Sequence, residues 1–446
     1  SGARRAESRN LVIIPVREDA SLFPYSERLA MIRTGCDGLA DVVDGSAYQI
    51  SAATFPTYFL KDLSDAAETQ MRLDIDLFGR HIAPALGASV RFVGSEPSDP
   101  LTARYNALMK ELLPSYGVEV VEIPRRQTSA VFPSDVSVIL SDVSVILSEV
   151  EESASQPITA TTVRALLDAG QFREASALTP ESTWPYLLAF LAERALLREL
   201  DTPLKPGLVG PDSVGAHRDM DYGVMRKGIA AIRPFFPRMA LAASPEELRQ
   251  LGIDAEKAML AATGGVNTHR GAIFALGLAL NAAGQLSSRR MESGDNERFM
   301  KDCLVGFAQS ICRKSLNESE LHSTAPSHGA KAVKEYGVKG ARELACEGYK
   351  PLFEDWLPYY RACHFERSRE ICTLLRIMAT LDDTCVIHRV GYDRAREIKD
   401  EAKAMDGRFV MDRLKSMCDR YASEGISPGG AADMLALTIF MDSILN

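Results

Sequence analysis

The sequence lacks the features that mark membrane-spanning, secreted or nucleic-acid-binding proteins. Its 446 residues contain no run of about 18 apolar residues, which is the length that a membrane-spanning helix needs. The first ten residues are polar and basic with no apolar segment behind them, so we do not expect a signal peptide. The net charge of −9 supplies no overall positive field for nucleic acid or an anionic membrane. A polyphosphate ligand would therefore need a local cluster of basic groups.

The eight cysteines form no CxxC pair and no regular framework, so we expect reduced thiols in a cytoplasmic protein. Cys346, Cys372 and Cys385 lie in apolar or helical contexts, which favours buried packing over nucleophilic chemistry. Histidines four residues apart, the common pairing in metal sites, are missing, as is the Walker P-loop spacing.

The first part of the chain alternates between strand-like and helix-like segments. Apolar runs at residues 11–16, 89–93 and 118–123 predict buried strands, and residues 26–35 and 101–113 predict helices between them. Strands separated by helices indicate a parallel sheet with crossover connections, and hence an α/β domain over residues 1–172. Within it, residues 135–148 repeat DVSVILS twice and run into acidic residues, so we interpret residues 135–156 as an insertion.

From residue 183 onward the pattern becomes helical. Apolar residues recur at helical spacing and strand-like alternation is nearly absent, which predicts an all-α domain over residues 180–446. The predicted helices cover residues 186–200, 255–262, 271–283, 331–347, 371–381, 411–422 and 431–445.

The first polar cluster of the helical part runs from KPGLV (205–209) to GAHRDMD (215–221). Proline and glycine keep its first piece in a loop. If a helix has begun by His217, then His217 and Asp221 share a face while Asp219 points elsewhere. Caps and surface charges are the structural alternative for these residues.

The second cluster, TGGVNTHRG (263–271), is the most informative. A glycine-bearing loop leads into a helix whose first turn carries Thr268, His269 and Arg270. Free N–H groups, the positive end of the helix dipole and an arginine together make an anion site. The alternative is that Asn267 or Thr268 merely caps the helix.

Two further clusters follow. GVKGARE (337–343) presents Arg342 and Glu343, which could face a ligand or each other. The adjacent carboxylates of DDT (382–384) could bind Mg²⁺, which favours oxygen ligands. In SPGGAAD (427–433), we interpret the serine and proline as a helix start, and the role of the aspartate is left open. His217, His269 and His388 each stand beside an arginine, for which we prefer phosphate or base contacts to packing.

In this order, the clusters resemble the triphosphoribosyl-dephospho-coenzyme A synthase family, which serves citrate lyase and malonate decarboxylase. The resemblance spans residues 199–445 and rests on KPGLV, GAHRDMD, TGGVNTHRGAIFALGL, GVKGARELACEGY, DDTCVIHR and SPGGAADMLAL. Two departures are Cys385, where the family usually has asparagine, and an interposed charged segment at residues 363–370.

The resemblance implies a transferase that joins C1 of the ATP ribose to a ribose hydroxyl of 3′-dephospho-CoA and releases adenine. Carboxylates would stabilise the oxocarbenium character, a base would take the acceptor proton, and Mg²⁺, Lys and Arg would hold the triphosphate. The catalytic candidates are His217, Asp219, Asp221, Glu343, Asp382 and Asp383. The candidates for binding ATP are Lys205, Gly264, Gly265, Asn267, Thr268, His269, Arg270, Arg342, Arg389, Gly429 and Gly430. The candidate Mg²⁺ ligands are Asp219, Asp221, Asp382 and Asp383, and the sequence leaves open which carboxylate is a base.

The first part of the chain resembles the nucleotidyltransferase region of the citrate lyase ligase family. The likeness rests on REDASLFPYSERLAMIRTG, ATFPTYFLKD, FVGSEPSDPLTARYNALMKELLPSYGVEVVEIPR and ITATTVRALL. That family activates acetate with ATP and acetylates the lyase's prosthetic thiol. Residues 158–164 match its ISxSxVR-type phosphate motif, whereas its HxGH motif is absent, so we expect a truncated active site.

Three hypotheses follow. The chain is an active helical transferase behind an incomplete nucleotidyltransferase; or its first part is a non-catalytic docking module for the citrate lyase acyl carrier protein; or both parts are inert because the insertions damage their cores.

Overall fold

The computed structural model describes residues 11–16, 22–44, 64–96, 99–125, 158–287, 296–322, 328–363, 368–405 and 411–445. The predicted insertion at 135–156 and the centre of the charged segment at 363–370 lie outside these residues. The chain divides into two compact units, residues 1–165 and 166–446.

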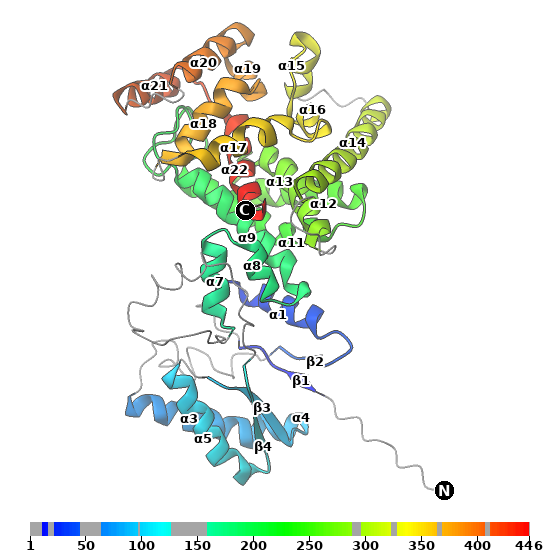
Figure 1. Cartoon of the computed structure of the whole chain (residues 1–446), viewed down its shortest axis with the longest axis vertical. Helices are drawn as coiled ribbons and strands as arrows, with labels where there is room; N and C mark the ends of the chain where they lie inside the picture. Colours follow the sequence, from blue (N-terminus) through cyan, green and yellow to red (C-terminus); the bar gives the residue numbers. More distant parts are fainter. Residues whose placement is uncertain are drawn as a thin grey trace. The chain divides into compact units, whose positions relative to one another are not determined.

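The first unit contains two parallel strand pairs, each joined through a helix (Figure 1). β1 (Val12–Ile13) pairs with β2 (Asp41–Val42) across α1 (Tyr25–Gly35). β3 (Val90–Gly94) pairs with β4 (Glu119–Ile123) across α5 (Pro100–Leu112). The predicted α/β class and parallel pairing are confirmed, but the strand expected at 11–16 is only two residues long, and its residues are half-buried rather than buried.

The core of the first unit lies between its helices and the β3–β4 pair. Met71 and Ile75 of α3 (Asp65–Leu77) pack with Leu108 of α5, and all three are fully buried. Ser64 caps α3 and Asp99 caps α5, each accepting a backbone N–H of the first turn. The remaining elements are η2 (Phe78–Ile82), α4 (Ala83–Leu86) and η3 (Leu113–Tyr116).

The second unit is helical, as the sequence predicts. Its elements are α7 (Ala160–Asp168), α8 (Phe172–Ala177), η4 (Glu181–Thr183), α9 (Trp184–Asp201), α10 (Tyr222–Ile232), η5 (Arg233–Phe235), α11 (Phe236–Leu241), α12 (Pro245–Ala262), α13 (Arg270–Ser287), α14 (Asn296–His322), α15 (His328–Tyr336), α16 (Ala341–Cys346), η6 (Leu352–Trp356), α17 (Leu357–Ala362), α18 (Arg369–Thr380), α19 (Thr384–Val390), α20 (Tyr392–Met405), α21 (Met411–Glu424) and α22 (Gly429–Leu445). α7 spans the division between the units.

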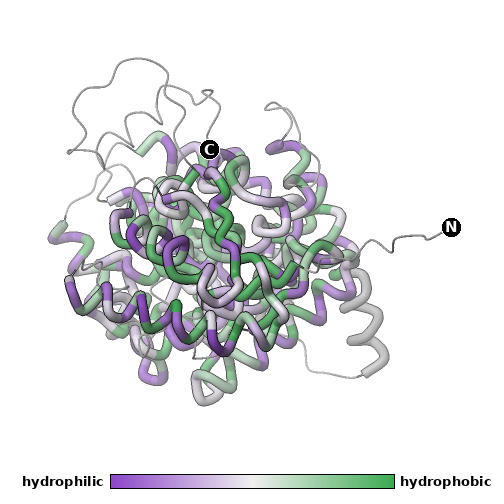
Figure 2. Tube along the Cα trace, turned by 90° about the horizontal axis from the view of Figure 1, so that it is seen from below, coloured by the Kyte–Doolittle hydropathy of each residue, from purple (hydrophilic) through white to green (hydrophobic). Residues whose placement is uncertain are grey.

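The core of the helical unit forms around α22, which packs against α9, α13 and α18. Most of α22 is apolar, and Leu435, Leu437 and Phe440 are fully buried, which is the pattern of a helix buried on all sides. Along the coloured tube in Figure 2, hydrophobic and hydrophilic stretches follow one another, as expected for helices with one covered face.

Two predicted helices differ clearly from the observed ones, and the condition that a helix has begun by His217 is not met. The segment 331–347 is two helices, because Gly337 adopts a φ of 66° and ends α15. α12 begins at Pro245, where Ser244 caps it, ten residues before the expected start. α10 begins at Tyr222, so His217 lies in a loop and shares no helical face with Asp221.

None of the helices in the described residues combines the length and the apolar character that a membrane span requires.

Candidate active site

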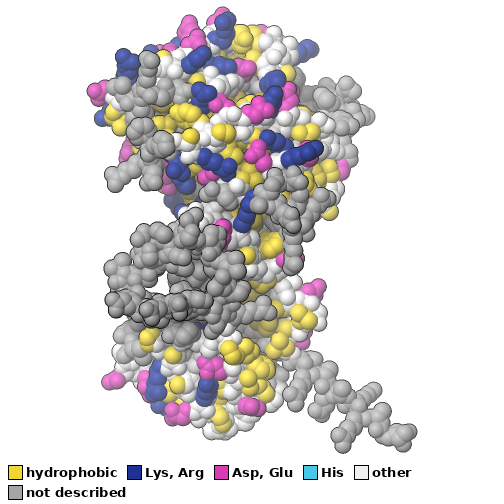
Figure 3. Space-filling view, viewed as in Figure 1, with side chains coloured by type: hydrophobic (Ala, Val, Ile, Leu, Met, Phe, Trp, Pro, Cys, Tyr) yellow, Lys and Arg dark blue, Asp and Glu magenta, His cyan; other side chains and the backbone are white. Residues whose placement is uncertain are grey.

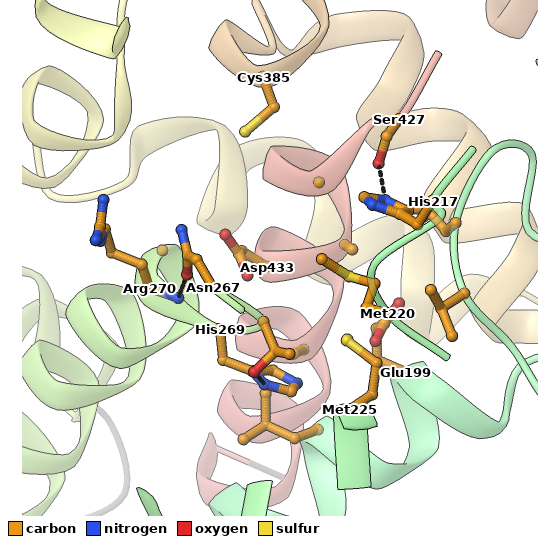
Figure 4. Close-up of a pocket in the computed structure, with 18 of the residues that line it drawn as sticks. Glu199, His217, Met220, Met225, Asn267, His269, Arg270, Cys385, Ser427 and Asp433 are labelled. Carbon is orange, nitrogen blue, oxygen red and sulfur yellow. Dashed lines mark hydrogen bonds between the residues drawn. The ribbon is translucent and has the colours of Figure 1, made fainter. Parts of the chain in front are cut away.

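A cavity of about 310 Å³ opens among α9, α10, α13, α19 and α22 of the helical unit (Figure 4). Each polar cluster of the sequence except GVKGARE contributes to its wall. The lining residues are Leu196, Glu199, Leu208, Val209, His217, Met220, Met225, Asn267, Thr268, His269, Arg270, Gly271, Thr384, Cys385, His388, Arg389, Ser427, Gly429, Ala432, Asp433 and Ala436.

The KPGLV loop is fixed by a close backbone approach. Gly207 has a φ of 71°, and a Cβ there would lie 1.9 Å from the carbonyl oxygen of Ile426. Only glycine fits both requirements. The contact places this loop directly against the segment that carries Ser427.

Lys205 lies behind the cavity wall rather than on it. Its Nζ donates to the backbone oxygen of Glu199 at 2.7 Å and to its Oε1 at 2.5 Å. Both side chains are almost completely buried. Burial raises the pKa of Glu199, although Lys205 opposes that shift. Lys205 therefore serves to hold a buried carboxylate at the cavity.

His217 is the centre of a polar group at the cavity mouth. Its Nε2 lies 2.8 Å from the Ser427 hydroxyl, as drawn in Figure 4, and its Nδ1 lies 3.4 Å from Nη2 of Arg389. Asp219, whose side chain is 65% exposed, lies 3.9 Å from Nδ1. Burial, and then the charge of Arg389, lower the pKa of His217, while Asp219 opposes them. His217 is therefore a neutral ring near physiological pH.

The start of α13 combines the two interpretations that the sequence offered. Asn267 caps the helix, since its Oδ1 accepts the Arg270 N–H at 3.1 Å. His269 turns inward, is 3% exposed, and pairs its Nδ1 with the Thr268 hydroxyl at 2.8 Å. Burial, with Lys205 adding to it, lowers the pKa of His269 to about 3. His269 is thus a buried neutral group and not a cationic contact for phosphate.

Positive character comes instead from two helix starts and two arginines. The first residues of α13 and α22 both line the cavity, so the positive ends of the two helix dipoles favour an anion there. Asn267 and Asp383 accept some of the N–H groups at these helix starts. Arg270 and Arg389 stand on the wall beside them, and Arg270 also pairs with Glu256. On the face of the helical unit drawn in Figure 3, cationic and anionic side chains are interspersed.

Asp433, whose role the sequence left open, reaches from α22 into the cavity (Figure 4). Ser427 also belongs to the site, because its hydroxyl forms a hydrogen bond with His217. The sequence had favoured a purely structural role for Ser427 at the start of a helix. α22 itself begins at Gly429, two residues later.

Several predicted residues lie outside the wall. Asp221 caps α10, accepting the Val224 N–H at 2.8 Å, and Asp382 pairs with Lys399 at 2.6 Å. Asp383 is buried, with Oδ1 accepting the Cys385 N–H and Oδ2 the Ala431 N–H. The cavity wall also excludes Gly264 and Gly265, which turn the chain after α12, Gly430, which abuts Asp383, and Arg342 and Glu343 of α16.

The structure does not bring Asp219, Asp221, Asp382 and Asp383 together around one point. Within the described part of the chain, no group of three or more His, Cys, Asp or Glu side chains is arranged to hold a metal ion. The donor set therefore does not fit a metal held by the protein alone.

Of three further wall residues, the sequence reasoning missed Glu199, misinterpreted Cys385 and left the role of Asp433 open. Glu199 sits in an ordinary helical pattern, and only its proximity to KPGLV could have marked it. For Asp433, the SPGGAAD motif was the sequence signal that could have marked it as a site residue. Cys385 was expected to be buried packing but is exposed to the cavity, because it falls in the first turn of α19 that faces inward.

The fold and the site define a class of protein: an all-helical domain with a cavity that favours an anionic ligand. A family model described as ATP:dephospho-CoA triphosphoribosyl transferase matches residues 185–446, more than half of the chain, and the chain belongs to that family. ATP as a substrate and dephospho-CoA as the acceptor fit this family description.

Curated relatives match the same part. A probable 2-(5″-triphosphoribosyl)-3′-dephosphocoenzyme-A synthase of Stutzerimonas stutzeri strain A1501 is 38% identical over 279 residues, which cover 58% of this chain and 91% of the relative. One with the same description from Azotobacter vinelandii strain DJ is 36% identical over 290 residues, covering 60% and 94%.

The first unit matches a second family model. Residues 3–144 match the model described as the citrate lyase ligase C-terminal domain, which confirms the resemblance of this part. No solved structure matches the chain.

Proposed function

We propose that the cavity transfers the triphosphoribosyl group of ATP to a ribose hydroxyl of 3′-dephospho-CoA and releases adenine. The observation that carries this proposal is the meeting of two helix N-termini, Arg270 and Arg389 at one cavity in a protein of net charge −9. Such a site attracts a polyphosphate locally. The names of the relatives supply the identity of the acceptor.

Within this proposal, His217 is the base for the acceptor hydroxyl. It is neutral near physiological pH because burial and Arg389 lower its pKa. Since the Arg389 guanidinium can only donate, Nδ1 is the nitrogen with the free electron pair, and the Nε2–H donates to Ser427, which orients the ring. A neutral histidine within hydrogen-bond reach, directly or through one hydroxyl, is suited to accept a proton. Glu199, kept in place by Lys205, supplies a carboxylate for the oxocarbenium character.

We propose that Mg²⁺ enters with the triphosphate of ATP, since the described residues offer no cluster of three ligands. Mg²⁺ commonly keeps several waters and binds through substrate phosphates plus one or two carboxylates. Asp219 is the predicted ligand best placed for this, because it is exposed beside His217.

Adenine release from ATP, followed by chromatography with the full chain, tests the proposed reaction. Adenine should appear only when dephospho-CoA and Mg²⁺ are both present. Omitting either component, or chelating Mg²⁺, should abolish the adenine peak. No adenine under complete conditions would overturn the proposed function.

For the first unit we propose docking of the citrate lyase acyl carrier protein, on the basis of its match to the ligase family over residues 3–144. The domain boundary we propose lies between residues 172 and 180. The full chain should retain the carrier protein in a pull-down, and an excess of unlabelled carrier should release it. Acetate-dependent pyrophosphate release would instead assign a ligase activity to this unit.

We also propose a cytoplasmic location, since no disulfide joins the eight cysteines.

A further inference from the structure

Asp433 is a carboxyl group that faces other acids at the cavity wall and has no cation beside it in the described structure. Burial, and then the charges of Glu199 and Asp383, raise its pKa well above the ordinary value of an aspartate. The backbone N–H of Ala272 is the one group that acts in the opposite direction. Glu199 differs from Asp433 because Lys205 compensates its charge.

The position of Asp433 is tightly set. A Cβ at Gly271 would lie 2.0 Å from Oδ2 of Asp433, so the carboxyl rests directly on the backbone at the start of α13. This packing leaves the side chain little freedom to turn away from the cavity. The absence of a side chain at residue 271 is therefore what allows the carboxyl to be there.

Tyr349 is a second buried titratable group near Asp433. It is fully buried, its backbone has a φ of 50°, and its hydroxyl has no hydrogen-bond partner among the described residues. An aromatic residue with positive φ is an uncommon conformation that the surrounding packing must enforce. Burial, and then the nearby Asp433, raise the pKa of Tyr349, so its phenol stays protonated. Burial, and then the charges of Asp383 and Asp433, also raise the pKa of the Cys385 thiol, which lines the cavity.

A neutral carboxyl also suits the ligand. An ionised Asp433 would repel a polyanionic ligand in the same cavity, whereas a protonated one offers a proton and no opposing charge. Two acids in one site with different environments are a recurring arrangement in acid–base catalysis. Here Glu199 has a cationic side chain beside it, Lys205, whereas Asp433 has only the backbone N–H of Ala272 to favour its ionised form.

We infer that Asp433 is the general acid that protonates adenine as its bond to the ribose breaks. This inference rests on the proposed function. The bond between C1′ and N9 of ATP breaks, its electron pair goes to adenine, and a ring nitrogen of adenine takes the carboxyl proton of Asp433. A C1′–O bond forms to the acceptor hydroxyl, whose proton passes to His217. Solvent then removes that proton from His217 and returns one to Asp433.

The test compares two substrates with the full-length chain. One is ATP, whose adenine needs a proton to leave. The other is ribose 5-triphosphate carrying 4-nitrophenol at C1′, which leaves as a stable phenolate without protonation. Asp433→Asn keeps the shape of the side chain and removes its acidic proton. Asp442→Asn, on the same helix but outside the cavity wall, is the matched control.

With ATP, Asp433→Asn should lower kcat by about 10²- to 10⁴-fold, the usual contribution of a general acid. Its KM for ATP should change little, because binding is not the function removed. With the nitrophenyl substrate, the same variant should work at close to the wild-type rate. Asp442→Asn should match the wild-type protein with both substrates.

A second measurement needs no variant. If Asp433 must be protonated, the kcat of the wild-type protein with ATP should fall as pH rises through the raised pKa of that carboxyl. The nitrophenyl substrate should lack this alkaline decline. The groups facing Asp433 that titrate are Glu199, Asp383, Tyr349 and Cys385. Because they act on both substrates alike, they do not produce the difference.

Three results would overturn the inference. These are an equal loss with both substrates, full activity of Asp433→Asn with ATP, and a loss that excess Mg²⁺ restores, which would make Asp433 a metal ligand. A wild-type protein that releases no adenine at all would instead overturn the proposed function, so the two failures are distinguishable.

Discussion

The Ser427 hydroxyl lies 2.8 Å from Nε2 of His217, although 210 residues separate them in the chain. Two backbone features produce this contact. Gly207 brings the KPGLV loop against the carbonyl of Ile426, and Gly215, with a φ of 57°, turns the chain toward His217. The start of the last helix and a loop after α9 thus become one polar group at the cavity.

The Ser427–His217 contact predicts coupled effects on catalysis. His217→Gln should lower kcat by about 100-fold or more, because it removes the base. Ser427→Ala should lower it by roughly tenfold, the order expected when a hydrogen bond to the base is lost. The double variant should be little worse than His217→Gln alone. Additive losses would show that the two side chains act separately, and Ser443→Ala on α22 is the control.

Protonation of His217 should cause the decrease in activity on the acid side of the pH–rate profile. Because burial and Arg389 lower its pKa, the ring stays neutral until the pH falls below 6.5, the ordinary value for histidine. Activity should then fall as His217 takes up a proton. His217→Gln should lack this decrease, and an unchanged decrease in that variant would assign it to another group.

His269 predicts a pH dependence of stability. Its pKa is about 3 in the folded chain and 6.5 in a free histidine, so below pH 6.5 the unfolded state binds the extra proton. The free energy of unfolding should fall as pH drops from 6.5 toward 3, by about 1.4 kcal/mol per pH unit from this group. Urea unfolding of wild type and His269→Asn measures it. Parallel pH curves for the two proteins would contradict the prediction.

Gly207 should tolerate no side chain. Gly207→Ala places a Cβ 1.9 Å from a carbonyl oxygen at a positive φ, so it should destabilise the fold by about 3 kcal/mol or more. Gly264→Ala is the matched control, since Gly264 has a φ of 67° with nothing within 4 Å of the added Cβ. That variant should lose only about 1 kcal/mol. Similar losses in urea unfolding would show that φ alone, and not the contact, matters at residue 207.

The arginines at the cavity should carry ATP affinity. Arg270→Ala and Arg389→Ala should each weaken ATP binding by about ten- to a hundredfold, the effect of losing a charge-assisted contact of about 1.5–3 kcal/mol. Isothermal calorimetry measures this directly. Arg413→Ala on α21, away from the cavity wall, should bind ATP like the wild type. Unchanged affinity in both cavity variants would remove the arginines from the binding site.

Local signals in the sequence determined most of the fold class. The helical periodicity after residue 183, the Asn267 cap of α13 and the apolar runs that form β3 and β4 depend on neighbouring residues, and the structure contains each of them. The order of the motifs likewise sufficed for the resemblance, which the family match confirms. Residue types at fixed spacing carry such information directly.

Tertiary structure decided which of those residues meet. The sequence could not distinguish Asp383, whose oxygens are taken up by backbone N–H groups, from Asp433, which faces the cavity. Nor could the sequence show that the His269 side chain is buried or that Cys385 lines the cavity. Contacts between residues more than 150 positions apart depend on how α9, α13, α19 and α22 pack. Burial and neighbouring charge, which set the protonation of each group, exist only once that packing has formed.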